Sequence, residues 1–203
     1  MLLSAFALVL LLSISKVLPK YLARKALHIG SGTLCIIAYD KGYKTLIIIV
    51  GLIALLALLS KKVTLPTMKE YALRKKKRRV DLGIMNFIIS TVVFTMLEIP
   101  LTHVSPLYYA DPMGAIVGRN IKTPGLPYSG KKSIGGTLAV IFTAFLNLVY
   151  FAKASYTDAI IWAVAVGLIE LYSGEWDNVA ISGILALRFL IFYSDDNYFN
   201  SKV

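Results

Sequence analysis

Long apolar blocks separated by short polar connectors run along almost the whole chain. After a first block over residues 2–18, the later blocks cover approximately 26–39, 45–60, 83–99, 104–118, 134–151, 159–172 and 178–193. A helix that crosses a bilayer uses about 20 apolar residues, so the blocks predict about seven or eight spans, several of them short, tilted or re-entrant. The pattern therefore predicts an all-α fold, a polytopic integral membrane helix bundle.

The blocks leave no room for a separate soluble domain in 203 residues. We expect a single transmembrane domain over 1–203, with a first span within 1–22 that can be peripheral to the catalytic core and a basic cytoplasmic loop over 61–82. The chain is 57% hydrophobic and 16% charged, whereas soluble domains are about 25% charged. Because Cys35 is the one cysteine, an intramolecular disulfide and a cysteine-based zinc cluster are excluded.

Lys and Arg total 22 against 11 Asp and Glu, which gives a net charge of +11. When the connectors are assigned alternately to two sides, seventeen of these basic residues fall on one side and four on the other. The positive-inside rule then places the basic loops in the cytoplasm and the N-terminus outside. The basic run 74–79 could indicate a nucleic-acid site. Its place between two spans instead favours a loop beside anionic lipid headgroups, without a nucleic-acid partner.

Ionisable side chains are costly in a bilayer, so polar clusters near the span ends are the candidates for chemistry. The first cluster is Arg24, Lys25 and His28. Arg24 and His28 are four residues apart and share a helix face. The small residues over 30–32 allow another backbone or a ligand to come close. The alternative is that these cations only anchor the helix at the membrane interface.

The second cluster begins with Asp111-Pro112 inside an apolar block. Aspartate before proline is typical of a helix N-cap, so we expect a broken helix here. Gly114, Ala115 and Gly118 share a face with Asp111. One interpretation is small-residue helix packing with Asp111 bound to a neighbour. The other is that Asp111 holds a hard cation such as Mg²⁺ beside a strip that admits a phosphate-bearing ligand.

The third cluster lies in the connector 121–137, directly after Arg119. Its candidate phosphate-binding residues are Lys131, Lys132, Ser133, Gly135 and Gly136. Ser133 is the expected N-cap of the next helix, and a helix N-terminus with free amides and adjacent cations binds anionic phosphates. The alternative is an ordinary basic loop at a membrane edge.

The fourth cluster is Glu170 followed by Asp177-Asn178. These residues could hold a metal ion or simply cap the last helix. All four clusters fall on the predicted cytoplasmic side, where nucleotides are found. Glu98 and His103 fall toward the opposite side, and we interpret them as interfacial or structural.

These clusters, in this order, resemble the CTP-dependent lipid-alcohol (polyprenol) kinase family, which includes phytol, farnesol and dolichol kinases and CTP-using diacylglycerol kinases. The resemblance runs from about Ala23 to Ile181. Its motifs are Arg24-Lys25-x-x-His28, Asp111 with Gly118-Arg119, Leu126-Pro127 before Lys131-Lys132-Ser133-x-x-Gly136-Thr137, and Glu170 with Asp177-Asn178. The related cytidylyltransferases end in a His-Gly-Gly and Asp-Arg-x-Asp signature that is absent here. Two positions depart from the family pattern, because many relatives have an acidic residue at Gly135 and a glycine at Asn120.

The resemblance implies a membrane transferase that moves the terminal phosphate of CTP to a lipid alcohol with Mg²⁺. It implies catalytic roles for Asp111, Lys132, Glu170 and Asp177, with Asp111 and Asp177 as metal ligands. The implied phosphate-binding residues are Arg24, Lys25, Gly114, Gly118, Arg119, Lys131, Lys132, Ser133, Gly135 and Gly136. His28 and Asn178 are candidates for base or polar support, and the base stays open between Asp111, Glu170 and His28.

Two alternatives to the kinase remain from the sequence. A CTP-dependent cytidylyltransferase would instead make a CDP-lipid. A non-enzymatic transporter or ion pathway would use buried carboxylates such as Asp111 and Glu98. The expected location is the endoplasmic reticulum in a eukaryote, the plasma membrane in a prokaryote, or a plastid. Neither the alcohol nor the oligomeric state follows from the sequence.

Overall fold

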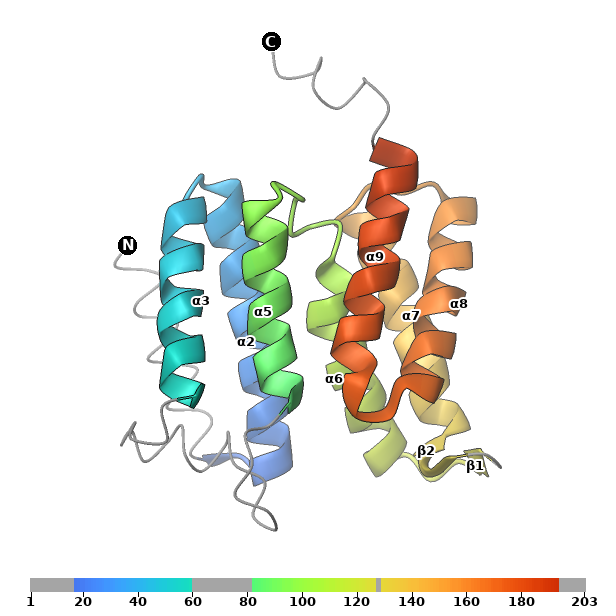
Figure 1. The fold of residues 1–203 in the computed structure, drawn as a ribbon. Coiled ribbons are helices and arrows are strands. Elements are labelled where there is room, and N and C mark those ends of the chain that lie inside the picture. The colour runs from blue at the N-terminus through green and yellow to red at the C-terminus, as the bar shows by residue number, and fades with distance from the viewer. Residues whose placement is uncertain (1–16, 60–81, 127–128, 194–203) are drawn as a thin grey trace.

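The computed structural model describes residues 17–59, 82–126 and 129–193, which form seven α-helices, a β-hairpin and a 3-10 turn (Figure 1). The elements are α2 (Lys20–Asp40), α3 (Lys44–Leu59), α5 (Leu82–Met96), α6 (Ser105–Asn120), β1 (Gly125–Leu126), β2 (Ser129–Ser133), α7 (Ile134–Tyr150), α8 (Tyr156–Ser173), η1 (Gly174–Trp176) and α9 (Asp177–Tyr193). Each predicted block from residue 26 onward is a helix, which confirms the predicted helical class. The predicted first span and the basic loop lie almost wholly outside the described residues.

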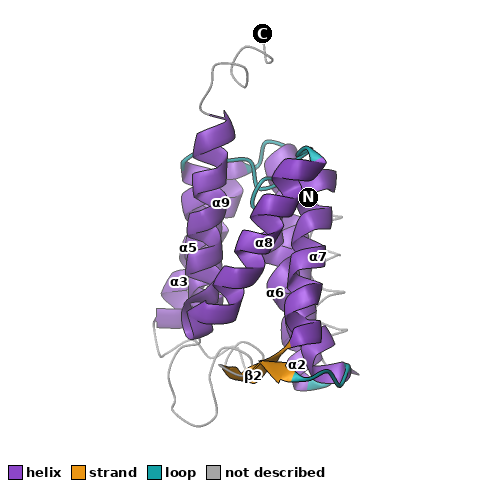
Figure 2. Ribbon diagram, turned by 90° about the vertical axis from the view of Figure 1, so that its right-hand side faces the viewer, coloured by secondary structure: helices purple, strands orange, loops and turns teal. Residues whose placement is uncertain are grey.

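Consecutive helices alternate in direction, so their connectors gather at two ends of the bundle (Figures 1 and 2). The start of α2, the end of α6, the hairpin and η1 meet at the lower end in Figure 1. We call this the basic end, because these segments carry Arg24, Lys25, Arg119 and Lys132, and Lys122 follows the end of α6. We call the opposite end the far end. The alternation is the one that the sequence predicts.

The helices pack as a series of neighbouring pairs. Helix α7 lies between α6 and α8, α3 packs on α5, and α2 packs on α6. Helix α9 contacts α8 and α5 and closes the bundle (Figure 2). The apolar core formed by these contacts includes Leu107, Val140 and Leu185, each 0% exposed.

The tightest crossing is between α6 and α7, where glycine backbones meet. A Cβ atom on Gly114 would overlap Val140 and lie 3.1 Å from the carbonyl oxygen of Gly136, and one on Gly118 would lie 3.3 Å from the Gly136 Cα. The small-residue strip of α6 therefore faces α7. The expectation that Gly114 and Gly118 leave room for a phosphate-bearing ligand is wrong, because the backbone of α7 fills that space.

The predicted break at Asp111-Pro112 is also wrong. Helix α6 continues from Ser105 to Asn120 through Pro112, and Pro106 occupies its first turn instead. An internal proline removes one backbone hydrogen bond at a cost of about 3 kcal/mol. Burial of α6 between α2 and α7 offsets this cost, because both faces of the helix are stabilised by packing on either side of the proline.

The connector between α6 and α7 contains a feature that the sequence did not predict. Residues 125–126 and 129–133 pair as an antiparallel hairpin with a bulge. Pro127 and Gly130 are turn formers, which supply the local signal for such a hairpin.

Helix α8 is the one described helix that passes a length and hydropathy test for crossing a bilayer, which alone is weak evidence of a membrane protein. Helices α3, α5 and α7 are apolar but shorter.

The glycine crossing gives a stability prediction. Gly114→Ala should lower the midpoint temperature of unfolding, because the new methyl group forces α6 and α7 apart at a cost of about 1–3 kcal/mol. Gly183→Ala on α9 is the matched control, since nothing lies within 4 Å of its added Cβ; there the higher helix propensity of alanine should leave stability unchanged or raised. Thermal unfolding of the purified variants measures both. Equal midpoints would contradict the close crossing.

Candidate functional site

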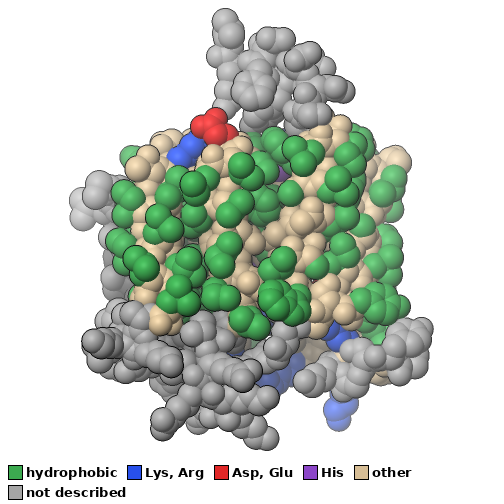
Figure 3. Space-filling view, viewed as in Figure 1, with side chains coloured by type: hydrophobic (Ala, Val, Ile, Leu, Met, Phe, Trp, Pro, Cys, Tyr) green, Lys and Arg blue, Asp and Glu red, His purple; other side chains and the backbone are tan. Residues whose placement is uncertain are grey.

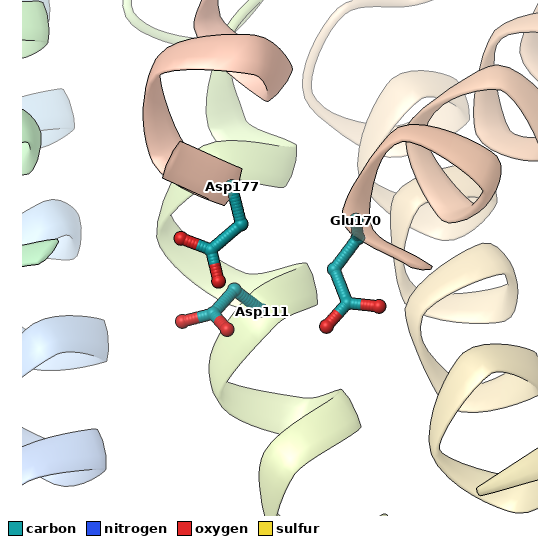
Figure 4. Close-up of side chains that lie close together, drawn as sticks. All are labelled: Asp111, Glu170 and Asp177. Carbon is teal, nitrogen blue, oxygen red and sulfur yellow. The ribbon is translucent and has the colours of Figure 1, made fainter. Parts of the chain in front are cut away.

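Three carboxylates from three different helices converge at the basic end. One oxygen atom each of Asp111 in α6, Glu170 in α8 and Asp177 in α9 lies within 4.8 Å of the other two. Figure 4 shows the three side chains directed toward a common space. The structure thus brings together three residues that are up to 66 positions apart in the chain.

The turn between α8 and α9 positions two of the three carboxylates. Helix α8 ends at Ser173, and Gly174 follows with a φ of +59°, a left-handed conformation that glycine adopts without strain. The short η1 turn then reverses the chain, and α9 begins at Asp177. Glu170 in the last turn of α8 and Asp177 in the first turn of α9 therefore flank the same reversal.

Lys25 of α2 neutralises Asp111. Its Nζ atom donates to Asp111 Oδ2 at 2.8 Å. The two side chains are 25% and 13% exposed, respectively, so water screens the pair only in part. Because Lys25 and Asp111 lie on different helices, the ion pair also joins α2 to α6.

Lys132, at the end of the hairpin, neutralises Glu170. Its Nζ atom donates to Glu170 Oε1 at 2.5 Å and also to the Glu170 backbone carbonyl. That carbonyl belongs to the last turn of α8, where helix carbonyls lack intrahelical partners. Lys132 therefore caps the C-terminus of α8, where a positive charge is favourable, while it neutralises the side chain of the same residue.

Asp177 is the carboxylate without a lysine partner among the described residues. Its Oδ1 atom accepts a hydrogen bond from the backbone N–H of Asn178 at 2.8 Å. It lies at the basic end of the bundle, where η1 meets α9. Burial, and then the negative charge of Asp111, raise the pKa of Asp177 to about 6. Both causes disfavour its charged form, which an added cation would stabilise.

The donor set fits a hard divalent cation. Carboxylate oxygens are the preferred ligands of Mg²⁺, which binds them at about 2.1 Å, so two ligands of one ion lie at most about 4.2 Å apart. The observed 4.8 Å limit requires only a small inward movement of the side chains. Among the described residues, only two of the three carboxylates have a lysine partner. The cluster can therefore hold a metal ion through Asp111 and Asp177, with Glu170 within reach.

The N-terminus of α7 differs from the predicted phosphate site. Ser133 is its N-cap, as predicted, and the Ser133 Oγ accepts a hydrogen bond from the Gly136 N–H at 3.2 Å. The Gly135 N–H donates to the Thr123 Oγ1 at 3.0 Å. The connector folds back so that Thr123 and Ser133 accept hydrogen bonds from these two amides. The expectation that the amides of Gly135 and Gly136 are free to bind phosphate is therefore wrong for this structure.

His28 fixes α2 to α6 next to the cluster. Its Nε2–H donates to the Leu107 carbonyl at 3.1 Å, and its ring packs on Phe87 with 4.4 Å between centroids. The bond ties α2 to α6 one turn before Pro112. Arg24 lies on the same helix, one turn before His28, at the basic end.

The remaining predicted residues lie around the cluster rather than in it. The guanidinium of Arg119 stacks over the ring of Tyr21, 4.0 Å from its centroid. Asn178 is buried, and its Nδ2 donates to the Gly83 carbonyl at 2.9 Å, which joins α9 to α5. The side chain of Lys131 lies outside the described part of the structure.

Sequence reasoning missed Tyr21 and Thr123. Tyr21 precedes the Arg24-Lys25 pair at a helix end, and an aromatic residue beside interfacial cations is a weak signal for stacking. Thr123 carries no local signal, because its partner Gly135 becomes a neighbour only after the hairpin forms.

Comparison of the chain with protein-family models, with curated protein sequences and with solved structures gives no match. The geometry of the carboxylate cluster is therefore the basis for assigning a function.

Proposed function

We propose that this protein is an integral membrane kinase that transfers the terminal phosphate of CTP to a membrane lipid alcohol with Mg²⁺. The alcohol would be an isoprenoid alcohol, such as phytol, farnesol or dolichol, or diacylglycerol. The observation that carries the proposal is the cluster of Asp111, Glu170 and Asp177 beside Lys25 and Lys132 at one end of a helix bundle. The resemblance of the motifs supports CTP as the donor and a lipid alcohol as the acceptor.

The distribution of polar side chains supports a membrane location. On α5, the buried polar residues are Asn86, Ser90, Thr91 and Thr95, and the exposed large apolar ones are Ile89, Val93 and Met96. Phe87, Val92 and Phe94 are buried beside these polar residues. The exposed face of α5 is therefore apolar, whereas that of a soluble amphipathic helix is polar. Figure 3 shows apolar side chains over the middle of the visible face, with basic side chains toward both ends and acidic ones toward the upper end. Such a wide exposed apolar surface is expected against lipid.

Hydrogen bonds between helices add to this support. Ser182 Oγ of α9 donates to Ser90 Oγ of α5 at 2.8 Å, and the hydroxyls of Thr91 and Tyr108 are 3.2 Å apart between α5 and α6. Small residues and interhelical polar contacts are what hold helices together in lipid, where burial of apolar surface gives no net gain. We therefore propose a polytopic bundle whose basic end faces the cytoplasm.

The cluster can position and neutralise a triphosphate. When bound, Mg²⁺ would supply positive charge that neutralises the negative charge developing on the phosphates during transfer. Asp111 and Asp177 would hold it, with Glu170 within reach. The ammonium groups of Lys25 and Lys132 would face the phosphate oxygens. Positioning and charge neutralisation are most of what phosphoryl transfer requires.

The lipid substrate would approach from the bilayer with its hydroxyl at the basic end. The hydroxyl oxygen forms a bond to the terminal phosphorus, the bond from that phosphorus to the bridging oxygen breaks, and CDP leaves. The hydroxyl proton passes to a carboxylate of the cluster or to water. The ring of His28 packs on Phe87 and is not part of the cluster, so Asp111 and Glu170 are the proposed proton acceptors.

The direct test uses the purified protein in lipid with CTP labelled in its terminal phosphate and a panel of lipid alcohols. The proposal predicts labelled phospholipid and release of CDP, both dependent on Mg²⁺. Release of pyrophosphate would instead identify transfer of the nucleotidyl group. Substrate flux across vesicles without CTP, and no labelled lipid, would identify a transporter.

Asp111→Asn should lower CTP-dependent phosphorylation about a hundredfold or more, because the amide supplies no negative charge to the metal or the site. The variant should still insert in the membrane. Asp40→Asn, an exposed aspartate at the far end of α2, is the matched control and should retain full activity. Near-normal turnover by Asp111→Asn would remove Asp111 from the metal role.

Lys132→Ala should raise the CTP concentration for half-maximal rate about tenfold or more, since a charge-assisted hydrogen bond contributes about 1.5–3 kcal/mol. Lys122→Ala removes an exposed basic residue from the same connector and should leave this concentration unchanged. Initial rates over a range of CTP concentrations measure both variants. If the two behave alike, Lys132 does not bind phosphate.

The orientation can be tested with single cysteines in a Cys35→Ala background. Lys41→Cys at the far end and Lys122→Cys at the basic end are both exposed positions. A maleimide that does not cross membranes should label residue 41 on intact cells, but residue 122 only after permeabilisation. The opposite pattern would reverse the proposed topology, and equal labelling of both in intact cells would contradict a spanning bundle.

A further inference from the structure

A buried ion pair lies at the far end of the bundle and takes no part in the chemistry above. Arg188 of α9 is 1% exposed, and its Nε donates to Asp158 Oδ2 at 3.2 Å. Its Nη2 donates to the same oxygen. Asp158 lies in the first turn of α8. The pair therefore joins the two helices that carry Glu170 and Asp177.

We propose that the Arg188–Asp158 pair is a positioning device, which fixes the depth and rotation of α9 and so places Asp177 beside Asp111 and Glu170. The positioning of α9 is inferred from the contacts between the helices. Its role in assembling the metal and phosphate site rests on the proposed function.

Helix geometry connects the two ends. Asp177 and Arg188 are eleven residues apart on α9, which is close to three full turns, so they share one face and lie about 16.5 Å apart along the axis. Glu170 and Asp158 are twelve residues apart on α8, or about 18 Å. The η1 turn closes this helical hairpin at the basic end, and the ion pair closes it at the far end. A hairpin held at both ends cannot slide.

The hydrogen bonds of Asn178 and Ser182 hold α9 on α5, and the apolar contacts of α9 would not by themselves fix its depth relative to α8. Its buried face includes Ile181 and Leu185. Sliding such side chains along an apolar neighbour exchanges one set of similar contacts for another, especially where lipid surrounds the helices. The ion pair instead has a narrow optimal geometry, and breaking it leaves a charge buried without its partner. The depth of α9 at which Arg188 pairs with Asp158 is therefore strongly preferred.

A third segment meets the pair. His103, in the connection from α5 to α6, packs its ring on Phe189, the residue after Arg188, with 5.5 Å between centroids. Helix α6, which carries Asp111, begins two residues after His103. The far end of α9 thus contacts Asp158 at the start of α8 and His103 just before the start of α6. A misplacement of about 1 Å at reacting groups can lower a rate about a hundredfold, so this distant contact bears on the cluster.

The test separates position from stability with an apolar replacement, Asp158→Leu/Arg188→Met. Replacing a buried ion pair by apolar residues commonly retains the fold. Nitroxide labels at Leu138 of α7 and Val179 of α9, both exposed and near the basic end, report the position of α9 by electron–electron double resonance in a Cys35→Ala background. The replacement should keep the unfolding midpoint but broaden or shift the distance distribution.

Lys44→Met/Glu98→Gln is the matched control, because it removes a more exposed ion pair, 3.4 Å long, at the same end of the bundle. It should leave the distance distribution unchanged. Arg188→Lys keeps a charge and a donor and should restore a narrow distribution. If the apolar pair fails to fold, Asp158→Asn/Arg188→Gln serves the same comparison.

Binding of Mn²⁺ gives the second readout. Its affinity should fall several-fold in the folded replacement variant and stay constant in the control, which a merely structural role would not produce. An unchanged distance distribution, or a shifted one with unchanged Mn²⁺ affinity, would overturn the inference. If the parent protein binds no Mn²⁺, the metal role proposed above fails, and the distance distribution alone decides the positioning of α9.

Discussion

Electrostatic repulsion among three nearby carboxylates is the constraint on which the rest of the structure depends. Charged carboxylates held this close in a largely apolar bundle are unfavourable unless cations stand beside them. Lys25 and Lys132 each neutralise one, and Asp177 is left without an ion pair among the described residues. The repulsion that destabilises the isolated cluster is the property that favours binding of a divalent cation.

The bundle maintains this arrangement by fixing three helices independently. Glycine contacts hold α6 against α7 so closely that a Cβ atom on Gly114 would lie 3.1 Å from the Gly136 carbonyl oxygen. Lys132 joins the hairpin to the end of α8, and Asn178 joins the start of α9 to α5. Because each carboxylate is carried by a rigid helix rather than a loop, their separation is set by helix packing.

The sequence predicted the helices well, but it did not predict which residues from different segments would contact one another. Apolar blocks and connector polarity are local signals, so the helices, their alternation and the Ser133 N-cap could be predicted. The predicted helix break at Asp111-Pro112 was wrong, because tertiary packing outweighed the local preference for a break. The sequence could not show whether the Gly135 amide is free, because its partner Thr123 comes near only when the connector folds back. Arg188 was visible as a charge in an apolar block, but its partner Asp158 is 30 residues away on another helix.

Under the proposed function, the carboxylate cluster and the phosphates of the nucleotide bind the same cation. Pulsed electron paramagnetic resonance of Mn²⁺ with CTP, on the purified protein in lipid, tests it most directly. The account predicts one bound Mn²⁺ per chain with hyperfine coupling to phosphorus, and loss of that bound species in Asp111→Asn/Asp177→Asn. An identical bound species in both proteins, or bound Mn²⁺ without phosphorus coupling, would contradict it.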